Sequence, residues 1–253
     1  MDSSNQYGTL AIQKELLKLL QQFDSFCQAN NIQYTVSSGT LLGAIRHQGF
    51  IPWDDDLDII VNRDNYMKLV KHLPSTHLLI EKDEDVVLWI DRIRLKDSVV
   101  VDGHLPTLDV FIIDNCPEGK ISSRIKVFLL KFLQGMMKSH PQYKNYPVLY
   151  KILSLSTYLL GRIVPDRLLT ALYHRVSSWG NSHATPFKSL CNDSFTGLSI
   201  KYPADIFTGT TRKKFENIEV SVMNGYDKYL TLIYGDYMSP PQEHNRIPTH
   251  GMQ

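Results

Sequence analysis

Four aspartates crowd the stretch SSGTLLGAIRHQGFIPWDDDLDIIV, which covers residues 37–61. Asp54, Asp55, Asp56 and Asp58 fall within five residues and lead directly into an apolar Ile-Ile-Val run. Like charges repel at this spacing, while the apolar run draws them toward a protein core. We therefore expect a positively charged group to be bound among these carboxylates.

The spacing of the aspartates suits a divalent cation. On an extended strand Asp54, Asp56 and Asp58 would share one face and Asp55 the other, with same-face neighbours about 6.6 Å apart. Two carboxylates can converge from that separation on Mg²⁺, whose oxygen ligands lie at about 2.1 Å. Because Mg²⁺ takes one or two carboxylates together with substrate phosphates, the pattern predicts a phosphorylated ligand as well as Mg²⁺ or, as the alternative, Mn²⁺.

The acidic cluster allows comparison with two other kinds of structure. A solvated acidic turn is the usual structure of such a sequence, and the aspartates alone leave that alternative open. An EF-hand loop starting at Asp54 is excluded, because its sixth position is Ile59 instead of Gly and its twelfth is Asn65 instead of Glu.

Ser38 and Gly39 precede the acidic stretch and favour a catalytic interpretation. A strand that turns through small residues into a helix N-terminus offers free backbone N–H groups and a positive dipole end, which suit a phosphate. Asp109, at the start of the strand-like run LDVFIID, could supply a third metal ligand or a general base.

Cationic and aromatic side chains lie close to this stretch in the sequence. Arg46 and His47 leave the predicted helix just before the aspartates, where they could bind phosphate or acceptor, or only balance the negative charge. Trp53 could stack on a nucleotide base or pack its loop.

A second basic group follows on another predicted strand. Arg92, Arg94 and Lys96 alternate along DRIRLKD, which would place them on one strand face. Arg presents a bidentate fork to a diphosphate, and a solvated strand face is the alternative.

The elements that must position these residues indicate an α+β fold. Residues 10–27 have the apolar periodicity of an amphipathic helix, and residues 32–39 read as a strand that ends in a turn. A short helix follows over residues 40–47, capped by Ser38 or Thr40. Residues 56–61, 77–82, 86–95 and 108–114 predict further strands. We expect a nucleotidyltransferase-like mixed sheet flanked by helices over residues 1–118, completed by a largely helical region with short strands over residues 119–253.

The charge distribution predicts different partners for the two regions. Residues 54–114 carry 14 Asp and Glu against 7 Lys and Arg, whereas residues 121–180 carry 9 Lys and Arg against one Asp. Helices in the basic region would suit an anionic membrane surface, although apolar helical stripes usually face the protein's own core. The sequence contains no recognised nucleic-acid-binding module, so no nucleic acid is expected as a partner.

Targeting signals and cysteines favour the cytoplasm. We find no secretory signal, no apolar stretch of about 18 residues, and three widely spaced cysteines that read as reduced thiols. The expected location is cytoplasmic, peripheral at the inner face of the membrane if the basic helices bind there.

The stretch SSGTLLGAIRHQGFIPWDDDLDI closely resembles the signature of the LicD family of the nucleotidyltransferase superfamily, which includes fukutin-related protein. The resemblance continues in LDVFIID, FENIEV and YLTLIYGDYMSPP, so it covers most of residues 34–241. It implies Asp56 and Asp58 as metal ligands, Asp54 as their partner in the metal site, and Asp109 as the later-strand carboxylate. Tyr234, Gly235 and Asp236 match the closing motif without an assigned role.

The resemblance also implies an activity. LicD-like enzymes transfer a phosphorylated alcohol such as phosphocholine from a CDP-linked donor to a glycan hydroxyl, in teichoic acid or lipopolysaccharide, and the acceptor is often lipid-linked. We therefore expect a Mg²⁺-dependent phosphotransferase that releases CMP. The alternatives are a nucleotidyltransferase that releases pyrophosphate and a non-enzymatic nucleotide-binding or scaffold protein.

Overall fold

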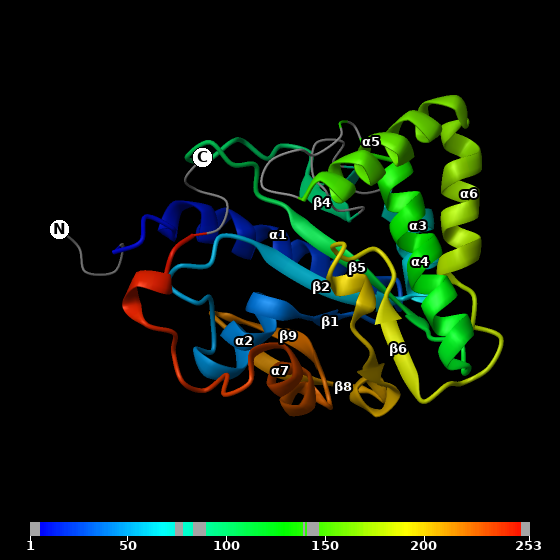
Figure 1. The fold of residues 1–253 in the computed structure, drawn as a ribbon. Coiled ribbons are helices and arrows are strands. Elements are labelled where there is room, and N and C mark those ends of the chain that lie inside the picture. The colour runs from blue at the N-terminus through cyan, green and yellow to red at the C-terminus, as the bar shows by residue number, and fades with distance from the viewer. Residues whose placement is uncertain (1–5, 74–77, 83–89, 139, 141–146, 249–253) are drawn as a thin grey trace. The chain divides into compact units, whose positions relative to one another are not determined.

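The computed structural model describes residues 6–73, 78–82, 90–138, 140 and 147–248 (Figure 1). Its contacts divide the chain into two units. The first contains Met1–Glu81, Asp91–Phe111 and Asp205–Gln253, and the second contains Lys82–Ile90 and Ile112–Ala204. The predicted arrangement, a nucleotidyltransferase-like core over residues 1–118 completed by a helical region over residues 119–253, stays a prediction.

The fold is α+β with a mixed sheet, as predicted. In the first unit the strand order is β1-β2-β5-β4-β3. The bounds are β1 Thr35–Val36, β2 Leu57–Asn62, β3 Leu78–Lys82, β4 Asp91–Leu95 and β5 Leu108–Asn115, and β5 continues into the second unit. The sequence prediction for β4 began at residue 86, and residues 86–89 lie outside the described part of the chain.

The helices of the first unit form where apolar periodicity predicts them. They are α1 (Leu10–Ala29), α2 (Ser38–Arg46), α3 (Arg63–His72) and α7 (Tyr226–Tyr234). In α1 the residues Leu16, Leu19, Leu20 and Phe23 are buried, as an amphipathic helix requires. The predicted stop of the last helix is confirmed, because α7 ends at Tyr234 and Gly235 follows with φ 67°, a conformation that favours glycine.

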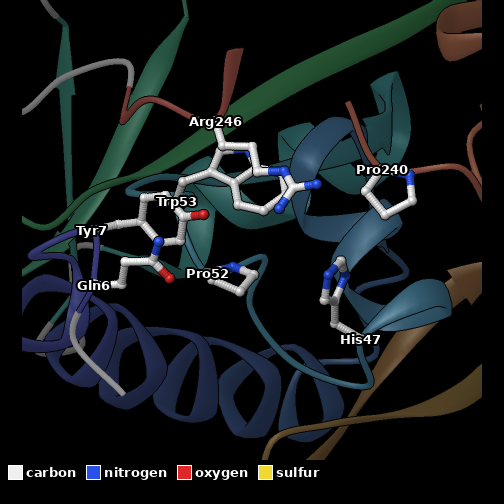
Figure 2. A pocket seen from close by; sticks show the side chains of 7 residues that line it. All are labelled: Gln6, Tyr7, His47, Pro52, Trp53, Pro240 and Arg246. Carbon is white, nitrogen blue, oxygen red and sulfur yellow. The ribbon is translucent and has the colours of Figure 1, made fainter. Parts of the chain in front are cut away.

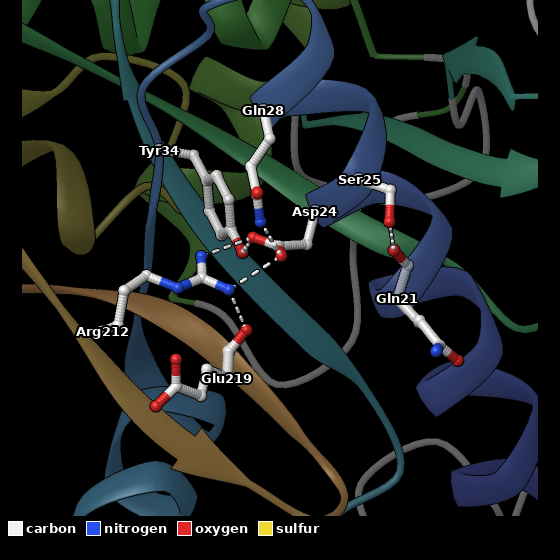
Figure 3. A network of polar contacts seen from close by, with 7 residues as sticks. All are labelled: Gln21, Asp24, Ser25, Gln28, Tyr34, Arg212 and Glu219. Atoms are coloured by element: carbon white, nitrogen blue, oxygen red, sulfur yellow. Dashed lines mark hydrogen bonds and ion pairs between the residues drawn. The ribbon is translucent and has the colours of Figure 1, made fainter.

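A polar network ties α1 to the hairpin of β8 (Thr210–Phe215) and β9 (Ile218–Met223) (Figure 3). Arg212 donates two hydrogen bonds to Asp24, at 2.6 and 2.8 Å, and the Tyr34 hydroxyl donates a third at 2.7 Å. Gln28 completes the shell around the carboxylate at 2.6 Å. Burial raises the pKa of Asp24, but these hydrogen bonds outweigh it, so the pKa lies below its usual value.

The second unit is built around helices α4 (Lys120–Met136), α5 (Val148–Ile163) and α6 (Asp166–Ser177). The β5 continuation pairs antiparallel with β6 (Phe187–Leu190), which pairs with β7 (Tyr202–Pro203). The short 3₁₀ helix η3 (Gly197–Ser199) contacts α4 and β6. Two further 3₁₀ helices follow it in the sequence, η4 (Ala204–Phe207) and η5 (Glu243–Asn245). Leu130, Leu133, Leu169, Tyr173, Cys191 and Leu198 form the core of this unit.

Lys126 departs from the expected orientation of α4. Its ammonium group is buried and donates to the carbonyl oxygens of Asn115 at 2.8 Å and Trp179 at 3.0 Å. Hydrophobic periodicity would turn the apolar residues Ile125 and Phe128 of this helix inward, but both are exposed. Two backbone acceptors therefore bring a lysine inward where hydrophobic periodicity alone places it outside.

The remaining sequence expectations concern thiols and membranes. Cys27, Cys116 and Cys191 are each buried and not in disulfides. Among the described residues, no helix has the length and apolar character needed to cross a bilayer.

Candidate functional site

The first turn of α2 is clamped to the beginning of β2. The Ser37 N–H donates to the Asp58 carbonyl at 2.9 Å, and the Asp58 N–H donates to the Thr40 hydroxyl at 2.9 Å. The N-cap prediction is wrong: the helix is preceded by Ser37, and Thr40 is used for the bond to Asp58 instead. These bonds bring the start of α2 to Asp58.

Ser38 and Gly39 both contact carboxylates at this helix start. Ser38 adopts φ 45°, and its hydroxyl hydrogen-bonds the Asp58 side chain. A Cβ on Gly39 would lie 2.8 Å from Asp54 Oδ2 and 3.0 Å from Oδ1, so only glycine lets this carboxylate lie so close. The N-terminal end of the helix dipole favours negative charge there. The role of Ser38 and Gly39 as a phosphate cradle stays a prediction.

The acidic segment is only partly a strand. β2 begins at Leu57, so Asp58 belongs to it, while Asp54 and Asp56 lie in the irregular segment that precedes it. The prediction that Asp54, Asp56 and Asp58 share one face of an extended strand is therefore wrong. They are nonetheless brought together, since both Asp56 and Asp54 act electrostatically on Asp58.

We call Asp54, Asp56, Asp58 and Asp109 the aspartate cluster. Burial and repulsion from neighbouring carboxylates dominate the electrostatics of its members Asp54 and Asp58. Burial raises the pKa of Asp58 well above its usual value, and repulsion from the other three members raises it further. The pKa of Asp54 is also raised, first by burial and then by Asp56 and Asp55. Asp54 Oδ2 is buried without a hydrogen-bond partner, which is costly for a carboxylate oxygen.

Asp109 enters the cluster from β5 and is already paired with a cation. In the β4–β5 register Arg92 lies opposite Asp109, and Arg92 Nε donates to Asp109 Oδ1 at 3.0 Å. Arg94 lies two residues further along β4, but Lys96 is exposed in the turn after it. The strand face predicted for three basic residues thus contains Arg92 and Arg94, and not Lys96.

Trp53, next to Asp54 in the chain, lines a pocket of about 440 Å³ (Figure 2). The pocket has aromatic and cationic walls and is lined by Gln6, Tyr7, His47, Pro52, Trp53, Pro240 and Arg246. The rings of Tyr7 and Trp53 meet edge to face with centroids 5.6 Å apart. The Arg246 guanidinium lies over the Trp53 ring, 5.4 Å from its centroid. A volume of this size is typical of small-ligand sites.

Arg46 and Arg246 place two positive charges beside this pocket. The Arg46 guanidinium donates to the Tyr237 carbonyl at 2.7 Å, and Arg246 donates to the Pro241 carbonyl at 2.9 Å. Burial lowers the pKa of Arg46, and Arg246 lowers it further, so the two guanidiniums repel each other. Burial and Arg46 likewise lower the pKa of His47 and favour its neutral form. An anion would relieve the repulsion between the arginines.

Tyr234 and Arg246 are site residues to which sequence reasoning assigned no role. Burial raises the pKa of Tyr234, and Tyr229 and the carboxylates of Asp58, Asp54 and Asp56 raise it further. The end of α7 therefore faces the cluster. The only sequence signal for Tyr234 was the closing motif, and no local pattern indicated Arg246, which lies 193 residues after Trp53.

The donor set is compatible with a magnesium site that a substrate completes. Within the described residues, no group of three or more His, Cys, Asp or Glu side chains is arranged to hold a metal ion. Asp56 and Asp58 could still supply two carboxylates, the number Mg²⁺ commonly takes when phosphates and waters complete its shell. The repulsion of the other carboxylates on the buried Asp58 and the unsatisfied oxygen of Asp54 fit a missing positive charge.

Comparison with known proteins shows which family this site resembles. Residues 31–113 match the family model described as LicD/FKTN/FKRP, nucleotidyltransferase domain. We call these residues the LicD-like segment. The LicD-like segment includes every member of the aspartate cluster together with Arg46, Trp53 and Arg92, whereas Tyr234 and Arg246 lie outside it.

Similarity to one known protein extends over almost the whole chain and not only over residues 31–113. The chain is 29% identical to the lipopolysaccharide cholinephosphotransferase LicD of Haemophilus influenzae over 255 aligned positions, which cover 92% of each protein. Over 60 residues it is 48% identical to an uncharacterized protein of Rickettsia prowazekii, covering 24% of this chain and 23% of that protein. A Rickettsia typhi protein is 46% identical over 60 residues, covering 24% of this chain and 19% of that relative.

Proposed function

We propose that this chain is a phosphotransferase that moves phosphocholine or a similar phosphorylated alcohol from a CDP-linked donor to a hydroxyl of a cell-surface glycan precursor. The observation that carries the proposal is the aspartate cluster around the buried Asp58, which lies within the segment that matches the LicD family model. Similarity over 92% of both chains to a lipopolysaccharide cholinephosphotransferase supports this substrate class.

Asp56 and Asp58 are the residues that would hold Mg²⁺, with Asp54 close beside them. When bound, the ion would neutralise negative charge on the diphosphate and on the departing CMP. A repulsive cluster of this kind destabilises the protein without a cation, which is typical of functional sites. The energetic cost argues against a purely structural or scaffold role.

The pocket lined by Trp53 and Arg246 suits the nucleotide half of the donor. Trp53 and Tyr7 offer aromatic surfaces to a base, and Arg46 and Arg246 offer two guanidiniums to its phosphates. The distal phosphorus could then reach the cluster, because Asp54 directly follows Trp53 in the chain.

The reaction proposed is an in-line displacement at the distal phosphorus. The acceptor oxygen forms a new bond to phosphorus, the bond to the bridging oxygen breaks, and CMP leaves. Asp109 either accepts the proton of the acceptor hydroxyl or serves as a further metal ligand. Arg92, which contacts Asp109 at 3.0 Å, orients this carboxylate in both cases.

Nucleotidyl transfer is the second candidate, favoured by the nucleotidyltransferase domain itself. In that reaction attack falls on the α-phosphorus of a nucleoside triphosphate and pyrophosphate leaves. The two reactions therefore use different donors and release different products.

A thermal-shift panel distinguishes the donors. CDP-choline, CDP-ribitol, CDP-glycerol, CTP and ATP are each added with Mg²⁺, since a ligand that binds the folded state raises the melting temperature by mass action. We expect the largest shift from a CDP-alcohol, and a much smaller one in Asp58→Asn. A larger shift from CTP or ATP than from every CDP-alcohol would favour nucleotidyl transfer.

A further inference from the structure

Helix α5 packs against α4 through its smallest side chains. Gly161 is the one buried residue of α5 that the structure describes, and a Cβ there would overlap the Met136 carbonyl. Gly135 of α4 approaches Thr157 so closely that a Cβ would lie 2.6 Å from its hydroxyl. Ser154 and Thr157, at helical spacing from Gly161, lie on the same side of α5 and are only partly exposed. A helix of a water-soluble protein normally turns its large apolar residues toward its neighbours, and not its glycine, serine and threonine residues.

The large apolar residues of α5 point away from the protein. Ile163 is 77% exposed and Leu149 is 65% exposed. The complete exposed apolar set on this helix is Val148, Leu149, Tyr150, Ile152, Leu153, Leu155, Leu159, Leu160 and Ile163. Small residues inside and large apolar residues outside is the arrangement that helices adopt next to lipid.

The N-terminal half of helix α4 also exposes large apolar side chains. Ile121, Ile125 and Phe128 are exposed, with Phe128 at 65%, while the core of the unit receives Leu130 and Leu133 instead. We call the exposed apolar residues of α4 and α5 the apolar surface. Monomeric soluble proteins rarely expose so many large apolar side chains together.

The charge of these helices selects among the partners that could cover the apolar surface. Residues 119–165 contain eight Lys and Arg and no Asp or Glu. Of these, Lys126 is buried, but Arg124 is exposed and Lys151 is partly exposed. A second copy of the chain would bring the same positive charge against it and be repelled, whereas anionic lipid headgroups attract basic residues.

We infer that α4 and α5 bind the surface of an anionic membrane, with α5 lying in the plane of the interface. Its apolar side chains would enter the boundary between headgroups and acyl chains, and the basic side chains would contact the headgroups. α5 has 16 residues and the described helices contain no membrane span, so the helix lies on the bilayer instead of crossing it. A lipid-linked acceptor would then be met at the membrane, but the inference does not depend on the proposed reaction.

Co-sedimentation of the full chain with vesicles tests the inference. We expect binding to phosphatidylcholine mixed with phosphatidylglycerol, weak binding to phosphatidylcholine alone, and a loss of affinity as salt is added. Ile152→Asn with Ile163→Asn should weaken binding at least about tenfold, because two apolar side chains that would enter the bilayer are lost. Arg124→Gln with Lys151→Gln should weaken it by about 20–30-fold on anionic vesicles only.

A matched control separates this surface from exposed apolar residues in general. Val99 and Val100 are exposed in the first unit, at 66% and 63%, so Val99→Asn with Val100→Asn should leave vesicle binding unchanged. Absence of binding to anionic vesicles at low salt overturns the inference, as does binding that the Ile152 and Ile163 changes leave intact. A dimer in light scattering that these two changes dissociate, without vesicle binding, would assign the surface to a second copy instead. CMP release, assayed separately, reports on the proposed function alone.

Discussion

Gly39→Ala tests whether the contact between the start of α2 and Asp54 sets the geometry of the site. The added Cβ would lie 2.8 Å from Asp54 Oδ2, about 0.6 Å inside the ordinary contact distance of 3.4 Å. Either the helix start or the buried carboxylate must move by that amount. Turning the carboxylate off its rotamer costs about 0.5–1.5 kcal/mol, and alanine in the helix returns up to about 1 kcal/mol. The net change in unfolding free energy should therefore stay within about 1 kcal/mol.

The rate of turnover should respond far more strongly than the stability. A displacement of 1 Å at a reacting centre can cost about 100-fold in rate, so a shift of about 0.6 Å should cost at least about tenfold. We expect CMP release from CDP-choline to fall by about that factor while the urea midpoint barely changes. Gly209→Ala is the matched control, since its Cβ would meet the side chain of Asn224 at 2.9 Å, away from the aspartate cluster. Turnover by Gly39→Ala within about threefold of the unmodified protein would refute the claim that Asp54 must be held here.

Three further changes test the electrostatics. The raised pKa of Asp58 means that its protonated form stabilises the fold below about pH 4, and that this contribution is lost as pH rises through the folded pKa. Asp58→Asn should therefore raise the melting temperature with EDTA present at pH 7 while abolishing CMP release; a lower melting temperature would count against the repulsion. The lowered pKa of Asp24 gives stability the opposite pH dependence. The stabilising contribution of Asp24 is present above about pH 4 and is lost as pH falls through the folded pKa. Asp24→Asn should cost about 2–3 kcal/mol in urea unfolding at pH 7, and less in acid; an equal loss at both pH values would contradict the assignment. Arg246→Gln should weaken CMP binding about tenfold in calorimetry with an unchanged melting temperature, whereas unchanged affinity would remove Arg246 from the site.

Local sequence patterns predicted the elements that carry the site. The apolar run after Asp58 marks β2, the periodicity of residues 10–27 marks α1, and Gly235 marks the end of α7. These features depend on residues close in sequence, so the sequence alone is sufficient to place them.

Features that depend on tertiary contacts were not predictable in the same way. Thr40 would have suited a helix cap, but it binds the Asp58 N–H, a partner supplied by another element. The pairing of Arg92 with Asp109 follows from strand register, which neither residue specifies by itself. Arg246 reaches Trp53 only because the C-terminal segment folds back onto the N-terminal part of the same unit.

Lys126 illustrates how tertiary contacts override a periodic pattern. Helical spacing separates it from Ile125 and Phe128, and hydrophobicity would turn the apolar pair inward. Two carbonyl acceptors satisfy the buried ammonium instead, at 2.8 and 3.0 Å, and the apolar pair is left exposed. The orientation of α4 is thus fixed by hydrogen bonds that the sequence pattern does not reveal.

If the aspartate cluster transfers a phosphorylated alcohol from a CDP-linked donor, every turnover releases one CMP. The most direct measurement follows the phosphorus products by ³¹P NMR while the full chain acts on CDP-choline and Mg²⁺ with a lipopolysaccharide acceptor. The account predicts CMP and acceptor-bound phosphocholine in equal amounts, and neither product with Asp58→Asn. Release of pyrophosphate from CTP without CMP formation from CDP-choline would contradict it.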